Sequence, residues 1–307
     1  MSSHRLDTLA KALRQTYDYK LGINEASDDA LPDRESAAEL CHRALGLLFP
    51  GFFTAARTSR EYLDSHIKQQ LIGLETLLRD QVQRALRFDL RVRGQELPAN
   101  LAAHTHELVD DLIGDLVTVR EVLATDVDAA FQNDPAASNR EVIVVSYPAI
   151  EALAVQRFAH RLYLREVPLI PRMMTEVVHG RTGIDIHPGA RIGESCFIDH
   201  GTGVVIGETA ILGKHCVLYQ GVGMIAWNPL AKDEHGDLKR GQTNKRHPEL
   251  QDHVTVYAGA SILGGDTVIG HHSVIGGNVW LTHSVEPHSV VTIKDPELNI
   301  RKRRGAG

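Results

Sequence analysis

Aromatic residues make up only 5% of this 307-residue chain, and it has three cysteines, Cys41, Cys196 and Cys216. Cysteines so few and so far apart argue against a disulfide framework. No apolar run approaches the roughly 20 residues that a spanning helix needs. The first residues also lack the apolar core of a signal peptide. We therefore expect a cytoplasmic protein with no membrane partner.

Neither sign of charge dominates the sequence. The chain has 33 basic and 39 acidic residues, which gives a formal net charge of −6. This balance gives no reason to expect nucleic acid or a membrane surface as a partner. With 43% hydrophobic and 23% charged residues, the chain is typical of globular proteins and long enough for about two domains.

Residues 1–182 have the periodicity of helices. Apolar residues between Arg60 and Leu90 recur at the three- and four-residue spacing of one helical face: Leu63, Ile67, Leu71, Leu74, Leu78, Val82 and Leu86. The segment 58–61 could form a capping box before this helix. Pro148 is well placed to open another helix that runs to Arg161. We predict an N-terminal α-helical domain over 1–182.

From Gly183 onward the period changes to six. Aliphatic residues six apart form four groups, separated by short insertions and one long loop: Ile186, Ile192, Ile198; Ile206, Leu212, Leu218, Met224; Leu250, Val256, Ile262; Ile269, Ile275, Leu281. Small residues follow four positions later at Cys196, Ala210, Cys216, Ala260 and Ser273.

Such a period predicts a triangular coil with three six-residue sides. The aliphatic side chains fill its interior, and the small residues fit where each corner narrows. We predict an α+β chain: the helical domain, a left-handed parallel β-helix over 183–291, and a basic tail over 292–307. Because Cys196 and Cys216 occupy the small inward position, we interpret both as packing residues.

Histidines are concentrated in the predicted coils, where ten of the 17 lie between His187 and His288. His200 stands at the first register slip, where a coil must bulge. Asp185 lies 15 residues before it, close to one circuit, so the two side chains could meet and the carboxylate could raise the basicity of the imidazole. His247 ends the long loop. The chain has no Gly-x-Ser-x-Gly motif, which favours direct base-assisted transfer over a covalent intermediate.

Three stretches resemble the serine O-acetyltransferase signatures, in the same order. They are Gly183-Ile184-Asp185-Ile186-His187-Pro188, then Ile198-Asp199-His200-Gly201-Thr202-Gly203-Val204-Val205-Ile206-Gly207-Glu208-Thr209-Ala210, then Lys245-Arg246-His247-Pro248. The resemblance implies transfer of an acetyl group from acetyl-CoA to the hydroxyl of L-serine, which gives the precursor of cysteine. It implies no metal cofactor.

The resemblance also assigns roles to single residues. His200 would be the general base, oriented by Asp185, and His247 would hold the hydroxyl or the developing oxyanion. Arg246 would pair with the serine carboxylate. The ammonium group would meet Asp199 and Asp134, supported by Glu208. The CoA arm would pass Ala258 and Gly259, and Gly223 would belong to the wall it meets.

The same resemblance implies a trimer, or a pair of trimers, in which His200 and His247 come from different subunits. It further implies inhibition by L-cysteine. The chain departs from the family pattern at Gly223-Met224-Ile225-Ala226, on the expected CoA wall. The loop 226–246 is longer than usual and polar, so we expect either a lid or a solvated insertion.

Two other functions remain possible when only the residues are considered. One is an acetyltransferase for another acceptor, such as homoserine or an amino sugar, although Arg246 with the two aspartates favours an α-amino acid. The other is a γ-type carbonic anhydrase with His247, His283 and His288 as zinc ligands. Arg246 beside His247 argues against that cation site.

The chain ends in a basic run, Arg301-Lys302-Arg303-Arg304, before Gly305-Ala306-Gly307. Family members commonly dock a C-terminal isoleucine into cysteine synthase. Because the last residue here has no side chain to fill an apolar pocket, we expect no tight complex with cysteine synthase through this tail.

Overall fold

The computed structural model describes residues 3–18, 31–53, 62–227 and 244–294. The capping box predicted at 58–61, most of the 226–246 loop and the basic run lie outside these residues. The described chain divides into two compact units, 1–31 and 32–307. The first contains one helix, α1 (Ser3–Tyr17).

The helices of the second unit are α2 (Arg34–Leu48), α3 (Leu63–Val92), α4 (Leu101–Asn133), α5 (Arg140–Ser146), α6 (Pro148–Leu164) and α7 (Ile170–Thr182). Helix α3 buries the predicted apolar face at Leu74, Leu78 and Val82, each with 0% exposure. Helix α6 begins at Pro148, as predicted, because proline's fixed φ suits the first helical position, where the missing N–H costs nothing.

No single helix of the described residues is long and apolar enough to cross a membrane. The pair α5 and α6, bent by 75°, passes such a test together, by length and composition only.

The strands begin directly after α7, and nearly all are two residues long. They are β1 (Asp185–Ile186), β2 (Arg191–Ile192), β3 (Phe197–Ile198), β4 (Val205–Ile206), β5 (Ile211–Leu212), β6 (Val217–Leu218), β7 (Gly223–Ile225), β8 (Glu249–Leu250), β9 (Thr255–Val256), β10 (Ser261–Leu263), β11 (Val268–Ile269), β12 (Val274–Ile275), β13 (Trp280–Leu281) and β14 (Val290–Val291).

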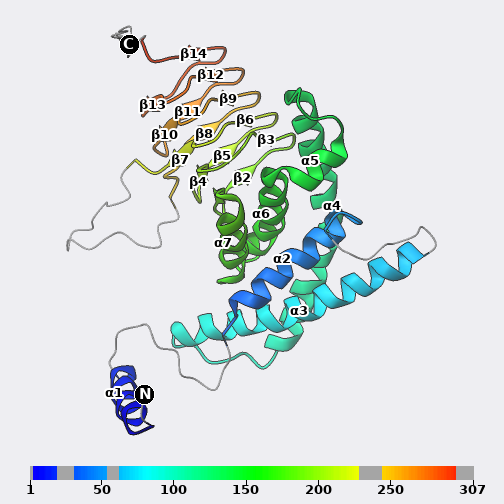
Figure 1. Cartoon of the computed structure of the whole chain (residues 1–307), viewed down its shortest axis with the longest axis vertical. Helices are drawn as coiled ribbons and strands as arrows, with labels where there is room; N and C mark the ends of the chain where they lie inside the picture. Colours follow the sequence, from blue (N-terminus) through cyan, green and yellow to red (C-terminus); the bar gives the residue numbers. More distant parts are fainter. Residues whose placement is uncertain (1–2, 19–30, 54–61, 228–243, 295–307) are drawn as a thin grey trace, which may run out of the picture. The chain divides into compact units, whose positions relative to one another are not determined.

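Up to β13 every third strand pairs in parallel, and β14 then pairs with β12 because the last coil has only an isolated bridge, Ile269 to Val285, in the intervening sheet; this makes three sheets. Sheet A has the order β1-β4-β7-β10-β13, sheet B β2-β5-β8-β11 and sheet C β3-β6-β9-β12-β14. The chain therefore turns through A, B and C in succession, and the coils stack in chain order (Figure 1). This is the predicted parallel β-helix with the helices before it, so the fold class is confirmed.

The register confirms the interior predicted from the period of six. Ile186 pairs with Ile206, and Ile206 with Met224, so the slip at Thr202-Gly203 lengthens one coil without turning its aliphatic residues outward. The small positions, Cys196 and Cys216 among them, have 0% exposure. Burial raises the pKa of the Cys216 thiol to about 12, as expected of a packing residue.

A buried ion pair joins the helices to the first coil. Arg157 on α6 donates to both carboxylate oxygens of Asp126 on α4, at 2.7 and 2.8 Å. The same guanidinium donates to the carbonyls of Ile192 and Gly193, and Asp126 also accepts from the Cys196 N–H. Because every partner of this pair is satisfied, the charges can stay buried.

Candidate active site

The three sheets meet at three edges of the coil, and most of the predicted site residues lie on two of them. The C–A edge comprises the connections from sheet C to sheet A, residues 199–204, 219–222, 257–260 and 276–279. The A–B edge includes residues 187–190, 207–210 and 244–248. The third, the B–C edge, comprises residues 193–196, 213–216, 251–254, 270–273 and 286–289.

His200 lies on the C–A edge, in the predicted bulge. Its φ is 58°, in the left-handed region, and its side chain is 69% exposed. The Nδ1 atom lies 3.6 Å from Oδ1 of Asp199, which is mostly buried. This arrangement leaves the imidazole open to a ligand and places a carboxylate beside it.

Asp134 approaches the same edge from the connection between α4 and α5. One of its oxygens accepts from the Tyr147 hydroxyl and the other from the Ala136 N–H, at 2.8 Å. These two hydrogen bonds, helped by the charge of His200, lower the pKa of Asp134. The Asp134 hydrogen bond raises the pKa of Tyr147 to about 12. Asp134 is thus a fixed anion near His200.

Asp185 does not make the predicted contact within the described residues. It lies at the start of β1, where Arg172 of α7 donates to its Oδ1 at 2.9 Å. No hydrogen bond or ion pair joins it to His200 in the part of the chain that the structure describes. Its orienting role stays a prediction.

The A–B edge holds His247 in an enclosed position with 8% exposure. Thr209 donates its N–H to Nδ1 at 3.2 Å, and its Oγ1 lies 2.9 Å from the same nitrogen. Because that hydroxyl oxygen already accepts from the backbone N–H groups of Arg246 and His247, its own proton is directed to Nδ1. The neutral ring then carries its proton on Nε2.

Burial, followed by the charge of Arg246, lowers the pKa of His247 to about 4. The ring is therefore neutral near pH 7 and offers an Nε2–H donor. It lies directly over Gly207, where an added Cβ would stand 2.1 Å from Nε2. Only glycine leaves room for the imidazole at this position.

Glu208 connects the residues around His247. Its carboxylate accepts from the Tyr163 hydroxyl at 2.7 Å and from the Arg246 guanidinium. Burial raises the pKa of Glu208, but these two hydrogen bonds, together with the charges of His187 and Arg246, lower it by more, so the net change is downward. The predicted Glu208, Arg246 and His247 are thus brought together.

Sequence reasoning missed the side chains that hold both clusters: Tyr147, Tyr163, Thr209 and His187. His187 packs edge-on against Tyr163, and burial lowers its pKa. The register could have revealed it, because the Ile186–Ile206 pairing sets His187 beside Gly207. Tyr163 lies on α6 and Tyr147 between α5 and α6, so no periodicity in the coils points to them.

The residues predicted to meet CoA lie beside the His200 cluster. Ala258 and Gly259 follow Tyr257, whose ring stacks on Tyr219 at 4.9 Å. Gly259 has a φ of +73°, and an added Cβ would stand 2.4 Å from Oδ1 of Asn278. Gly223 begins β7 in the neighbouring sheet A and pairs with Ser261. Ala258 and Gly259 therefore leave a stretch without large side chains next to the stacked tyrosines.

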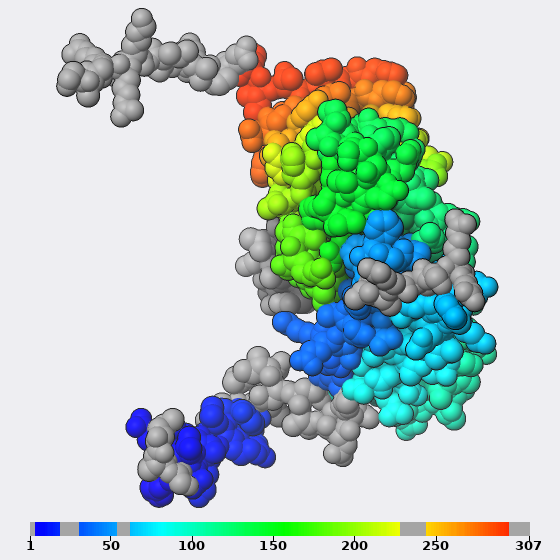
Figure 2. Space-filling view, turned by 45° about the vertical axis from the view of Figure 1, so that its right-hand side comes forward, coloured from blue at the N-terminus to red at the C-terminus, as the bar shows by residue number. Residues whose placement is uncertain are grey.

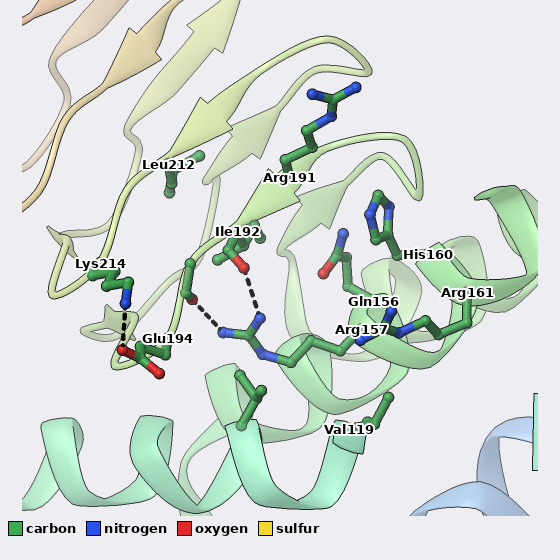
Figure 3. Close-up of a pocket in the computed structure, with 12 residues that line it drawn as sticks. Val119, Gln156, Arg157, His160, Arg161, Arg191, Ile192, Glu194, Leu212 and Lys214 are labelled. Carbon is green, nitrogen blue, oxygen red and sulfur yellow. Dashed lines mark hydrogen bonds and ion pairs between the residues drawn. The ribbon is translucent and has the colours of Figure 1, made fainter. Parts of the chain in front are cut away.

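A pocket of about 500 Å³ lies elsewhere, between α4, α6 and sheet B. It is lined by the Arg157 network and by Arg191, Glu194 and Lys214, with none of the predicted site residues (Figure 3). The pocket therefore lies where the helices pack against the first coils.

A parallel β-helix of six-residue coils, with imidazoles and paired charges at its edges, is typical of hexapeptide-repeat acyltransferases. No protein-family model matches the chain. The plasmid serine acetyltransferase of Synechococcus elongatus is 42% identical over 291 residues, covering 94% of this chain and 90% of that protein.

Two solved structures point to the same family. Serine acetyltransferase 1 of Entamoeba histolytica, in complex with L-cysteine, is 36% identical with a TM-score of 0.71, covering 92% of this chain and 97% of that one. Isoform 3 from the same organism, also with cysteine, is 31% identical with a TM-score of 0.68, covering 98% and 96%. The chain belongs to the serine acetyltransferase family, and it is an acyltransferase.

Proposed function

We propose that the enzyme transfers acetyl from acetyl-CoA to the L-serine hydroxyl in one direct step, with His200 as general base. His200 takes the hydroxyl proton while the serine oxygen attacks the acetyl carbon. The C–S bond then breaks, and the CoA thiolate takes the proton back. The exposed imidazole beside Asp199 supports this role, because a base must reach its substrate.

The observation that carries the proposal is the hydrogen bonding of His247. A neutral ring whose Nδ1 is occupied by Thr209 presents a fixed Nε2–H donor. Such a donor can stabilise the negative oxygen that develops on the acetyl carbon or hold the attacking hydroxyl. Arg246 at the same edge would bind the serine carboxylate through its planar fork.

The ammonium group of serine would meet Asp134 and Asp199 on the C–A edge. Since Arg246 and His247 lie on the A–B edge, one chain supplies the two halves of the site at different edges. We therefore propose that the C–A edge of one subunit faces the A–B edge of the next in a closed ring. A trimer is the smallest such ring that the three-sided coil suits.

Acetyl-CoA would enter along the C–A edge, past Ala258 and Gly259 and the wall that includes Gly223. The glycine in its left-handed conformation and the small side chains beside it support this path. We further propose Gly183 and Val291 as the limits of the coil domain, since α7 ends at Thr182 and β14 at Val291.

Thiol release from acetyl-CoA, measured against serine, homoserine and amino-sugar acceptors, tests the proposed function. Serine should give the highest kcat/KM by at least about tenfold, because a missing or misplaced charge partner costs more than 1.4 kcal/mol. A preference for a sugar acceptor would contradict the roles of Arg246 and the two aspartates.

L-Cysteine carries the same ammonium and carboxylate groups as serine. We propose that it inhibits this enzyme by occupying the serine site, in line with the two amoebal structures that contain cysteine. Inhibition should be relieved by added serine. Inhibition that serine does not relieve would require a separate site.

A further inference from the structure

The B–C edge carries a column of histidines that the proposed reaction does not use. His215, His253, His272 and His288 each stand at the corner of a successive coil, with φ between 56° and 60°. Their rings stack at 4.6, 4.5 and 5.1 Å. Left-handed backbone favours Asn, Asp and His over most other side chains, and here histidine alone occupies this corner in four successive coils.

His271 joins the upper end of this column. Its ring lies edge-on to those of His272 and His288, at 5.3 and 4.8 Å. One nitrogen from each of these three residues lies within 4.8 Å of the others. The Nδ1 atoms of His271 and His272 are already 3.1 Å apart, and one donates to the other.

We infer that His271, His272 and His288 form a site for a divalent transition-metal ion of the zinc class. Two nitrogen ligands of a tetrahedral zinc lie about 3.3 Å apart, given Zn–N distances near 2.0–2.1 Å. The His271–His272 pair meets this distance as it stands. A rotation of the exposed His288 ring brings the third nitrogen into place, and water completes the coordination.

Two other groups of potential ligands in the described residues are less suitable. His106 already pairs with Asp110 beside Glu75. In the group of Glu176, His179 and Asp185, the guanidinium of Arg172 contacts both carboxylates. A permanent cation occupies the position that a metal would need there.

A metal ion bound by the triad would crosslink two successive coils. His271 and His272 lie between β11 and β12, whereas His288 lies between β13 and β14, the last strand described. In the space-filling view these coils, in orange and red, form one end of the folded unit (Figure 2). Because the two proposed catalytic edges are the other corners, the metal would stabilise the end of the coil without entering the reaction.

Calorimetric titration of the full-length, chelator-treated protein with zinc sulfate tests the site. We expect one Zn²⁺ per chain and an increase in Tm. In His288→Asn and His271→Gln, the affinity should fall by at least about tenfold, since even the outer partners of ligands are worth that much. Asparagine tolerates the left-handed backbone at 288, which keeps the fold intact.

His215→Asn is the matched control, because it has the same residue type, corner and backbone conformation but lies outside the triad. It should bind zinc like the unmodified protein. Equal affinity in all variants, or loss of binding only when His200 or His247 is replaced, would overturn the proposal. So would the absence of zinc binding at neutral pH.

Discussion

His247 and His200 belong to the same proposed reaction but differ in almost every physical respect. His247 has 8% exposure, and Thr209 fixes its tautomer. His200 has a side chain that is 69% exposed, with its nearest carboxylate oxygen at 3.6 Å. The surroundings of His247 are complete within one chain. Those of His200 are open, as a general base requires if a neighbouring subunit and the substrate are to complete them.

The difference extends to the residues around them. On the A–B edge, Glu208 accepts hydrogen bonds from both Tyr163 and Arg246. On the C–A edge, Asp134 is fixed by Tyr147, yet the side chain of His200 is largely exposed. Preorganised donors reduce the cost of binding a charged transition state, so the A–B edge is suited to hold charge and the C–A edge to move the proton.

The largest expected effect concerns the base. His200→Asn should lower kcat by about 10²–10⁴, the usual contribution of a positioned general base, with the fold preserved. The matched control is His215→Asn, at another left-handed corner, which should retain full activity. An unchanged kcat/KM for serine in the His200 variant would remove this residue from the mechanism.

The lowered pKa of His247 should make the stability of the protein depend on pH. With a folded pKa of about 4 and an unfolded value near 6.5, His247 binds its proton more readily in the unfolded chain. The free energy of unfolding should therefore fall between about pH 6.5 and 4, by up to roughly 3 kcal/mol from this group. Denaturant unfolding of the wild type and His247→Gln, at pH 7.5 and 4.5, measures this; identical pH dependence in both would contradict it.

Arg246 should control acceptor affinity. Its charge-assisted contact with the serine carboxylate is worth about 1.5–3 kcal/mol, so Arg246→Ala should raise the KM for serine by tens-fold. The KM for acetyl-CoA should hardly change. If acetyl-CoA binding suffers instead, this guanidinium faces the co-substrate.

The smallest effect is expected at Tyr147, which acts only through Asp134. Tyr147→Phe removes one hydrogen bond and should raise the KM for serine about fivefold, at roughly 1 kcal/mol, with little change in kcat. Tyr62→Phe, at a residue with 63% exposure, provides the control. A loss of kcat alone would assign Tyr147 a different role.

The coils could be predicted from the sequence because the requirement that forms them is local. Each six-residue step must place an aliphatic side chain such as Ile206 or Met224 inside, so the period can be read directly. Partners such as Tyr163 and Arg172 could not be predicted, since they reach the edges only through the packing of α6 and α7 against the first coil. Asp185 illustrates the limit: spacing suggested His200, but its contact with the Arg172 guanidinium, which comes from α7, could not be seen in the coil period.

The separation of the predicted residues onto two edges has one decisive consequence. If each active site combines the C–A edge of one subunit with the A–B edge of the next, two inactive variants can complement each other. A ring that mixes His200→Asn and His247→Gln subunits contains interfaces with both histidines intact.

Co-expression of these two variants in equal amounts, followed by measurement of serine-dependent thiol release, tests this directly. Random mixing in a closed ring should restore about a quarter of wild-type activity, because each intact interface needs one particular variant on each side. Each variant alone should be nearly inactive. A mixture no more active than its parents would show that each chain builds its site alone, and would contradict the shared site.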